Sequence, residues 1–85
     1  MQNEKVKIEG IDVWIQAKTT NGRAYESEGI RVFSRVPIVG EYFKLDRMAE
    51  ARLYKVTAVL HLPFDEAESR AEVYGVEASD REIFQ

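Results

Sequence analysis

The fold of this 85-residue chain is decided by the stretch Ile11-Asp12-Val13-Trp14-Ile15-Gln16-Ala17-Lys18-Thr19-Thr20-Asn21-Gly22-Arg23. Apolar and polar residues alternate through its first eight positions, which predicts a half-buried β-strand. Its odd-numbered apolar residues would form one face, and Trp14 would point to the other. Asn21-Gly22 is a strong hairpin signal, because both residue types tolerate positive φ. The stretch therefore predicts the first half of a β-hairpin and the turn that follows it.

Runs with a period of two continue on both sides of this stretch. The first strand is expected within residues 5–19, with a change of phase and a β-bulge at Gly10. Further strands are expected at residues 25–36, 42–46, 53–62 and 71–78. In the run 53–62, strict alternation buries Leu60, whereas a bulge at Thr57-Ala58 would bury Val59 instead. The pattern leaves both alternatives open.

Five strands joined by turns near residues 20–23, 37–41, 46–52 and 63–69 form a meander that is too short for a sandwich. Bending the sheet into a partly open barrel would bury one face and protect its edges. Glycine bulges at Gly10, and at Gly29 or Gly75, would permit the bending. We therefore predict one all-β domain over residues 1–85, a small five-stranded SH3-like partly open barrel.

Two helical features stay open at this point. Residues 46–53 contain good helix formers, so a short helical turn at 47–52 is an alternative to a plain connection. Ser79 and Glu82 have capping-box spacing, so a second short turn is an alternative at the C-terminus. A helix at 46–53 would suit an oligonucleotide-binding-type barrel, which is our second choice of fold.

The composition excludes several classes of protein. The chain has no cysteine, which excludes a disulfide framework, a thiol nucleophile and the common zinc sites. No apolar run is long enough to span a bilayer, and the first residues do not resemble a signal peptide. We therefore expect a cytoplasmic protein that does not contact membranes.

The net charge of −3 is unevenly distributed. Residues 1–62 sum to +2 and residues 63–85 to −5. An acidic segment of this kind is typical of a solvated surface. Because long-range attraction to nucleic acid needs a net basic surface, we expect a protein partner before nucleic acid, which stays open as an alternative.

One part of the chain resembles a known group of proteins. The segment RVPIVGEYFKLD (35–46), followed by YKVTAVLH (54–61), resembles short bacterial SH3-like small-barrel proteins with a Pro-x-x-Gly-Glu and a Tyr-x-Val-x-x-Val-x-His pattern. The resemblance covers about a third of the chain. It implies a barrel fold and no activity, since the group has no assigned substrate, cofactor or catalytic residue.

Candidates for chemistry are few. His61 could act as a general base, but no motif supplies a nucleophile and an orienting carboxylate. Asp65, Glu66 and Glu68 are hard oxygen ligands, but they lack the glycine and the spacing of a calcium loop. We therefore expect no catalytic residue, no bound metal and no cofactor, and we do not expect an enzyme.

The remaining candidates are aromatic and basic. If Ile15 and Ile30 face the core, Trp14 lies on the outer face beside the row Arg31, Phe33 and Arg35. Tryptophan and arginine are enriched at binding hot spots. Two other arrangements are possible for this face: Trp14 and Phe33 could belong to the core, or Ile83 and Phe84 of the C-terminal tail could cover it.

These observations lead to one functional hypothesis and one main alternative. A small enzyme or ligand-binding domain comes last, because the sequence offers no set of nucleophile, base and orienting group. We expect a non-catalytic protein-interaction or assembly module that uses this face, or an open strand edge, to bind a protein partner or a second copy of itself. The alternative is a single-stranded nucleic-acid-binding barrel, in which Trp14 and Phe33 would stack on bases and Arg31 and Arg35 would bind phosphate.

Overall fold

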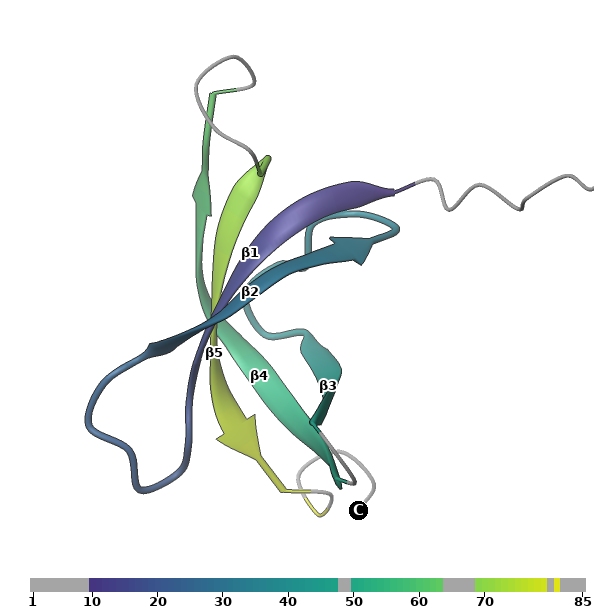
Figure 1. The fold of residues 1–85 in the computed structure, drawn as a ribbon. Coiled ribbons are helices and arrows are strands. Elements are labelled where there is room, and N and C mark those ends of the chain that lie inside the picture. The colour runs from purple at the N-terminus through teal and green to yellow at the C-terminus, as the bar shows by residue number, and fades with distance from the viewer. Residues whose placement is uncertain (1–9, 48–49, 64–68, 80, 82–85) are drawn as a thin grey trace, which may run out of the picture.

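The structure is a computed structural model, and it describes residues 10–47, 50–63, 69–79 and 81. Five strands make up its regular structure (Figure 1). They are β1 (Ile11–Lys18), β2 (Glu26–Phe33), β3 (Tyr42–Arg47), β4 (Glu50–His61) and β5 (Ala71–Ala78). The predicted all-β class is confirmed, and β5 has the predicted bounds. No helix in the described part of the chain is long and apolar enough to cross a membrane.

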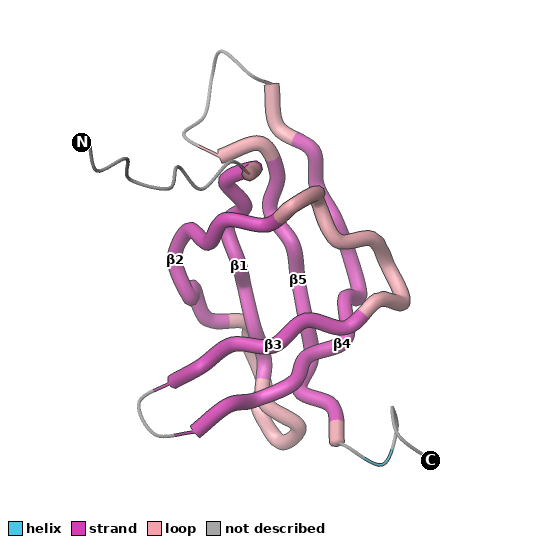
Figure 2. The backbone as a smooth tube through the Cα atoms, turned by 90° about the vertical axis from the view of Figure 1, so that its right-hand side faces the viewer, coloured by secondary structure: helices cyan, strands magenta, loops and turns pink. Residues whose placement is uncertain are grey.

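The strands form one curled sheet with the order β2-β1-β5-β4-β3. Figure 2 shows the β3–β4 hairpin crossing in front of β1 and β5, so that the sheet forms a half-barrel. This shape agrees with the predicted small SH3-like, partly open barrel. The expected meander is wrong in one respect, because β1 pairs with β5 in parallel. The first and last strands therefore lie side by side at the centre of the sheet.

The core lies on the concave face of this sheet. Val13 and Ile15 of β1 pack there with Tyr54 and Val56 of β4 and Val73 of β5, and all five side chains are at most 1% exposed. Phe43 and Leu45 of β3 close over them from the opposite side. The alternation predicted for β1 is therefore observed, because its odd-numbered residues are the buried ones.

Two bulges change the phase of the long strands. In β4 the pairing with β5 shifts at Thr57, which leaves Val59 half-buried and Leu60 52% exposed. In β2 the pairing with β1 shifts at Glu28, since Ile15 pairs with Gly29 and Gln16 pairs with Ser27. Gly29 has a φ of 81°, which a residue with a side chain rarely adopts. The bulge predicted at Gly29 is thus present.

Several local expectations need correction. The helical turn at 47–52 is wrong, because β3 runs to Arg47 and pairs with Glu50 at the start of β4. A helix this short is marginal alone, and the hairpin ladder satisfies the same backbone groups while burying Leu45. The bulge expected at Gly10 is not tested, because Gly10 precedes β1 and the residues before it lie outside the described part of the chain. Of the C-terminal turn only Ser79 and Arg81 are described, and Arg81 has helical backbone geometry.

Gly75 allows Phe43 to approach the floor of the half-barrel. A Cβ added at Gly75 would lie 2.8 Å from two atoms of the Phe43 ring and 3.1 Å from the Cβ of Tyr54. The Phe43 and Tyr54 rings are stacked, with their centroids 5.5 Å apart. The missing side chain at Gly75 therefore provides the space that the Phe43 ring occupies above β5.

The change Gly75→Ala should destabilise the protein by about 1–3 kcal/mol, because the new methyl group overpacks the contact with Phe43. In a strand without this contact, replacing glycine by alanine raises the free energy of unfolding. A lowered free energy of unfolding for Gly75→Ala would therefore be due to the contact with Phe43. Urea denaturation measures the effect. The cost should shrink in the Phe43→Leu background, and an unchanged or raised stability of the single variant would contradict the packing described here.

Candidate interaction surface

Trp14 lies on the outer, convex face of the sheet, as predicted. Its side chain is 37% exposed, and its indole Nε1–H donates a hydrogen bond of 2.8 Å to the hydroxyl of Ser27 on β2. The same hydroxyl accepts a bond of 3.3 Å from the backbone N–H of Gly29. Trp14 is therefore oriented by the bulge of β2. Because its only polar group already has a partner, the indole offers mainly apolar surface.

Phe33 does not share this face, so the predicted aromatic–arginine row is not one surface. Phe33 pairs with Ile11 on the core side and meets the Phe43 ring edge to face, with centroids 6.1 Å apart. The bulge at Glu28 is the physical reason. It inserts one residue and reverses the phase of everything that follows in β2.

The same reversal turns two aliphatic residues outward. Ile30 lies directly opposite Trp14, and Val32 lies opposite Asp12. Their side chains are 39% and 52% exposed. The expectation that Ile30 faces the core is therefore wrong. Trp14, Ile30 and Val32 form a connected apolar patch, which we call the Trp14 strip.

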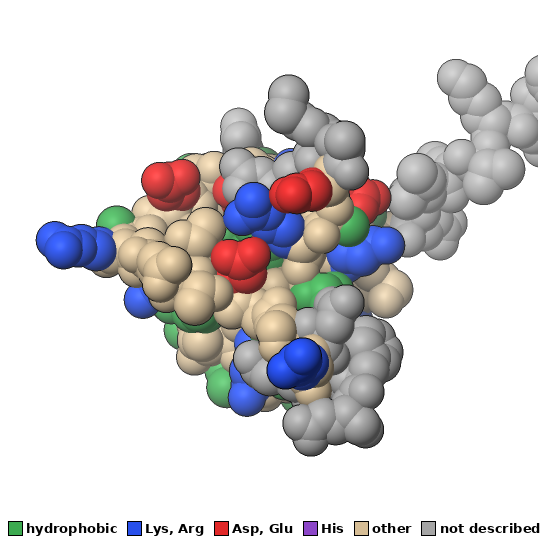
Figure 3. Space-filling model, turned by 90° about the horizontal axis from the view of Figure 1, so that it is seen from below, with side chains coloured by type: hydrophobic (Ala, Val, Ile, Leu, Met, Phe, Trp, Pro, Cys, Tyr) green, Lys and Arg blue, Asp and Glu red, His purple; other side chains and the backbone are tan. Residues whose placement is uncertain are grey.

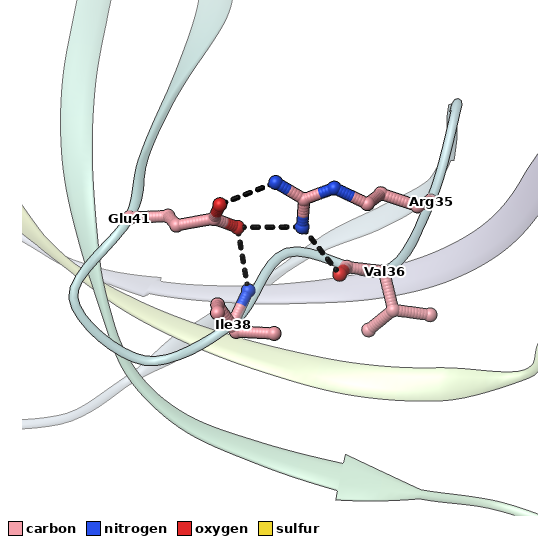
Figure 4. A network of polar contacts seen from close by, with 4 residues as sticks. All are labelled: Arg35, Val36, Ile38 and Glu41. Carbon is pink, nitrogen blue, oxygen red and sulfur yellow. Dashed lines mark hydrogen bonds and ion pairs between the residues drawn. The ribbon is translucent and has the colours of Figure 1, made fainter.

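Arg31 and Arg35 lie apart from the strip. Arg31 pairs with Val13, so it belongs to the core side of β2, although it is exposed at the rim. Arg35 forms a bidentate ion pair with Glu41, including a bond of 2.8 Å from Nη1 to Oε1 (Figure 4). The guanidinium of Arg35 is thus paired with a carboxylate of its own chain.

Glu41 holds together the arch of residues 34–41 that joins β2 to β3. Besides the Arg35 contact, its carboxylate accepts a bond of 2.8 Å from the backbone N–H of Ile38. The backbone of Glu41 is bound in turn to Val56 of β4 at 2.8 Å. The guanidinium of Arg35, with help from this N–H, lowers the pKa of Glu41 to about 2. The ionised carboxylate therefore fixes the shape of the arch, and the backbone hydrogen bond to Val56 fixes the arch to β4.

One residue of the loop between β1 and β2 packs on the outer face of the sheet. Tyr25 reaches back from this loop, bonds to the hydroxyl of Thr57 at 3.0 Å and meets the Tyr74 ring edge to face. Lys18 Nζ lies 5.1 Å from the centre of the Tyr25 ring. Tyr74 donates a bond of 2.6 Å to Glu72. This polar cluster separates Leu60 from the Trp14 strip, which is confined to β1 and β2.

The other sequence candidates do not assemble into a site. His61 is exposed at the end of β4. Asp65, Glu66 and Glu68 lie outside the described residues, as do Ile83 and Phe84. Within the described ranges no three histidine or acidic side chains are grouped so that they could hold a metal ion.

Comparisons with family models, curated proteins and solved structures find no match to this chain. The resemblance to short bacterial barrel proteins therefore remains an expectation.

Sequence reasoning missed Ile30 and Val32 as surface residues. The available signal was Gly29, which is the position of positive φ in the bulge. A glycine in the middle of a strand pattern indicates a possible bulge, and a bulge exchanges the faces of all following residues.

Replacing Glu41 by glutamine should lower stability at neutral pH and have little effect at pH 2. The folded-state pKa of Glu41 is lowered from about 4.5 to about 2, so its contribution is present above 4.5 and is lost as the pH falls toward 2. Urea denaturation of both proteins across this range measures the difference. A difference that does not change with pH would contradict the role given to the Arg35–Glu41 pair.

Proposed function

We propose that this chain is a non-catalytic protein-interaction module that assembles with a second copy of itself through the Trp14 strip and the free edge of β2. The observation that carries the proposal is the position of the strip. Two of its three residues, Ile30 and Val32, lie on a strand at the end of the sheet order. Exposed apolar side chains on an edge strand are typical of a binding surface.

The two ends of the sheet differ in how they are protected. On β3, the other edge strand, the exposed side chains include two charges, Lys44 and Asp46, and such charges oppose edge-to-edge pairing. The segment Ile30–Phe33 of β2 has one exposed charge, Arg31, on the opposite face from Ile30 and Val32. On β2 the bulge protects the first half of the strand. The second half, Ile30–Phe33, has regular pairing with β1 on one side. Among the described strands it has no partner on its other side.

A second copy suits this edge because the edge is self-complementary. Antiparallel pairing of Ile30–Phe33 with the same segment of a second molecule would satisfy the backbone groups of both edges. The two Trp14 strips would then be adjacent on one continuous sheet, and each would cover apolar surface of the other. The indole needs no polar partner, since Ser27 already accepts its N–H.

The alternative of single-stranded nucleic-acid binding has less support. It requires Trp14 and Phe33 on one face with two arginines available for phosphate. Phe33 packs against Phe43, and Arg35 is paired with Glu41. The remaining pair, Trp14 and Arg31, comes from opposite faces of the sheet. A chain with a net charge of −3 also offers little general attraction to phosphate.

The change Val32→Lys should abolish self-association, because it places a charge at the centre of the proposed contact. Val39→Lys is the matched control, since Val39 is a 61% exposed valine in the arch, away from β2. Size-exclusion chromatography with light scattering over a concentration series measures the mass. We expect dimers for the wild type and Val39→Lys, and monomers for Val32→Lys. A wild type that stays monomeric at high concentration would exclude the assembly.

A further inference from the structure

Symmetry limits the registers in which the β2 edges of two copies can pair. Two identical strands in an antiparallel pair are related by a two-fold axis perpendicular to the sheet. Such an axis keeps every side chain on its own face, and directly opposed residues of neighbouring strands also share a face. Opposed residues must therefore be an even number of positions apart in the sequence. The axis then passes through a residue and never between two residues.

Two registers keep most of the regular segment Ile30–Phe33 paired. In the Arg31-centred register, Arg31 lies opposite Arg31 of the second copy, and Ile30 lies opposite Val32. In the Val32-centred register, Val32 lies opposite Val32 of the second copy, and Arg31 lies opposite Phe33. An axis at either end of the segment would run the pairing into the bulge or past the end of β2.

Arg31 distinguishes between these two registers. Its side chain is exposed on the concave side of β2, and its Nη1 donates a bond of 3.4 Å to the carbonyl oxygen of Ile30. The charge therefore lies close to the backbone of its own strand. In the Arg31-centred register the two Arg31 Cβ atoms would be about 5 Å apart, and like charges directly opposite each other destabilise an antiparallel pair.

The Val32-centred register replaces this repulsion by favourable contacts. On the convex face, Val32 meets Val32 of the second copy, and both are 52% exposed in the single chain. On the concave face, the stem of Arg31 covers the Phe33 ring of the second copy, which also attracts the cation. An open depression of about 320 Å³ lies on this side, bordered by Phe33 and by Lys44 and Asp46 of β3. It gives room for the side chain of the second copy.

Long-range charge favours neither register. On the face of the molecule seen in Figure 3, acidic and basic groups are interspersed among the described side chains, with no large field of either sign. The net charge of the chain is also small, at −3. The choice between the registers is therefore made at short range, by the residues that meet in the contact.

We propose that Arg31 sets the register of the assembly and that the two copies pair in the Val32-centred register. This inference rests on the proposed function, because it specifies the contact through which the second copy binds. Val32 and Phe33 supply the attraction of the correct register, and the charge of Arg31 excludes the other one. Specific pairing commonly combines attraction in one arrangement with repulsion in its competitor.

The test is an isotope-filtered nuclear Overhauser experiment on a mixture of ¹³C-labelled and unlabelled wild-type protein. We expect Hα–Hα contacts between copies for Val32 with Val32 or for Arg31 with Phe33, whichever is the closely spaced pair without hydrogen bonds. Contacts of Arg31 with Arg31, or of Ile30 with Val32, would overturn the proposed register. A monomeric mass in light scattering would instead remove the proposed assembly, and this inference with it.

The variant Arg31→Gln tests the role of the charge, since it keeps most of the stem and removes the guanidinium. We expect it to remain a dimer and to show the Hα contacts of the Arg31-centred register beside those of the Val32-centred one. Arg23→Gln is the matched control, because Arg23 is exposed in the loop between β1 and β2, and it should show the Val32-centred register alone. An unchanged single register in Arg31→Gln, or loss of its dimer, would overturn the role given to Arg31.

Discussion

The bulge at Glu28 and Gly29 is the constraint on which the rest of this structure depends. It inserts one residue into β2 opposite Ile15 and thereby reverses the phase of the second half of the strand. Before the bulge, Glu26 faces the concave side; after it, Phe33 does. The place of Phe33 beside the core and the position of Ile30 and Val32 in the Trp14 strip both follow from this single shift. Ser27 stabilises it by bonding both to Trp14 and to Gly29.

Around this bulge, aromatic packing replaces the large core that a short chain cannot build. Phe43 stacks on Tyr54 and receives the edge of Phe33, so residues from β2, β3 and β4 meet over the floor of the sheet. Gly75 leaves the space that this stack needs. Gly40, with a φ of 95°, and the Arg35–Glu41 pair shape the arch that brings β3 back over the core. The sheet curls into an open half-barrel, and this curl places the rings of Phe33, Phe43 and Tyr54 in contact.

Much of the fold could be predicted from the sequence, because alternation reports burial directly wherever a strand is regular. The phase of β1, the bounds of β5 and the glycine bulge in β2 were all accessible in this way. The parallel pairing of β1 with β5 was not, since it joins residues about 60 positions apart and no local pattern encodes it. The hairpin at residues 46–53 was also missed as a continuous ladder, because good helix formers there are overridden by strand pairing.

The candidate surface was predicted less well, and for one physical reason. Trp14 was assigned correctly because β1 alternates without interruption. Phe33 and Ile30 were exchanged because the sequence marks the bulge only by Gly29, and a one-residue shift moves every following side chain to the other face.

The phase of β2 is tested most directly by side-chain nuclear Overhauser effects in the free protein. We expect contacts between the rings of Phe33 and Phe43, and between the Trp14 indole and the side chain of Ile30. Contacts of Phe33 with Trp14, together with contacts of Ile30 with Ile15, would contradict this phase.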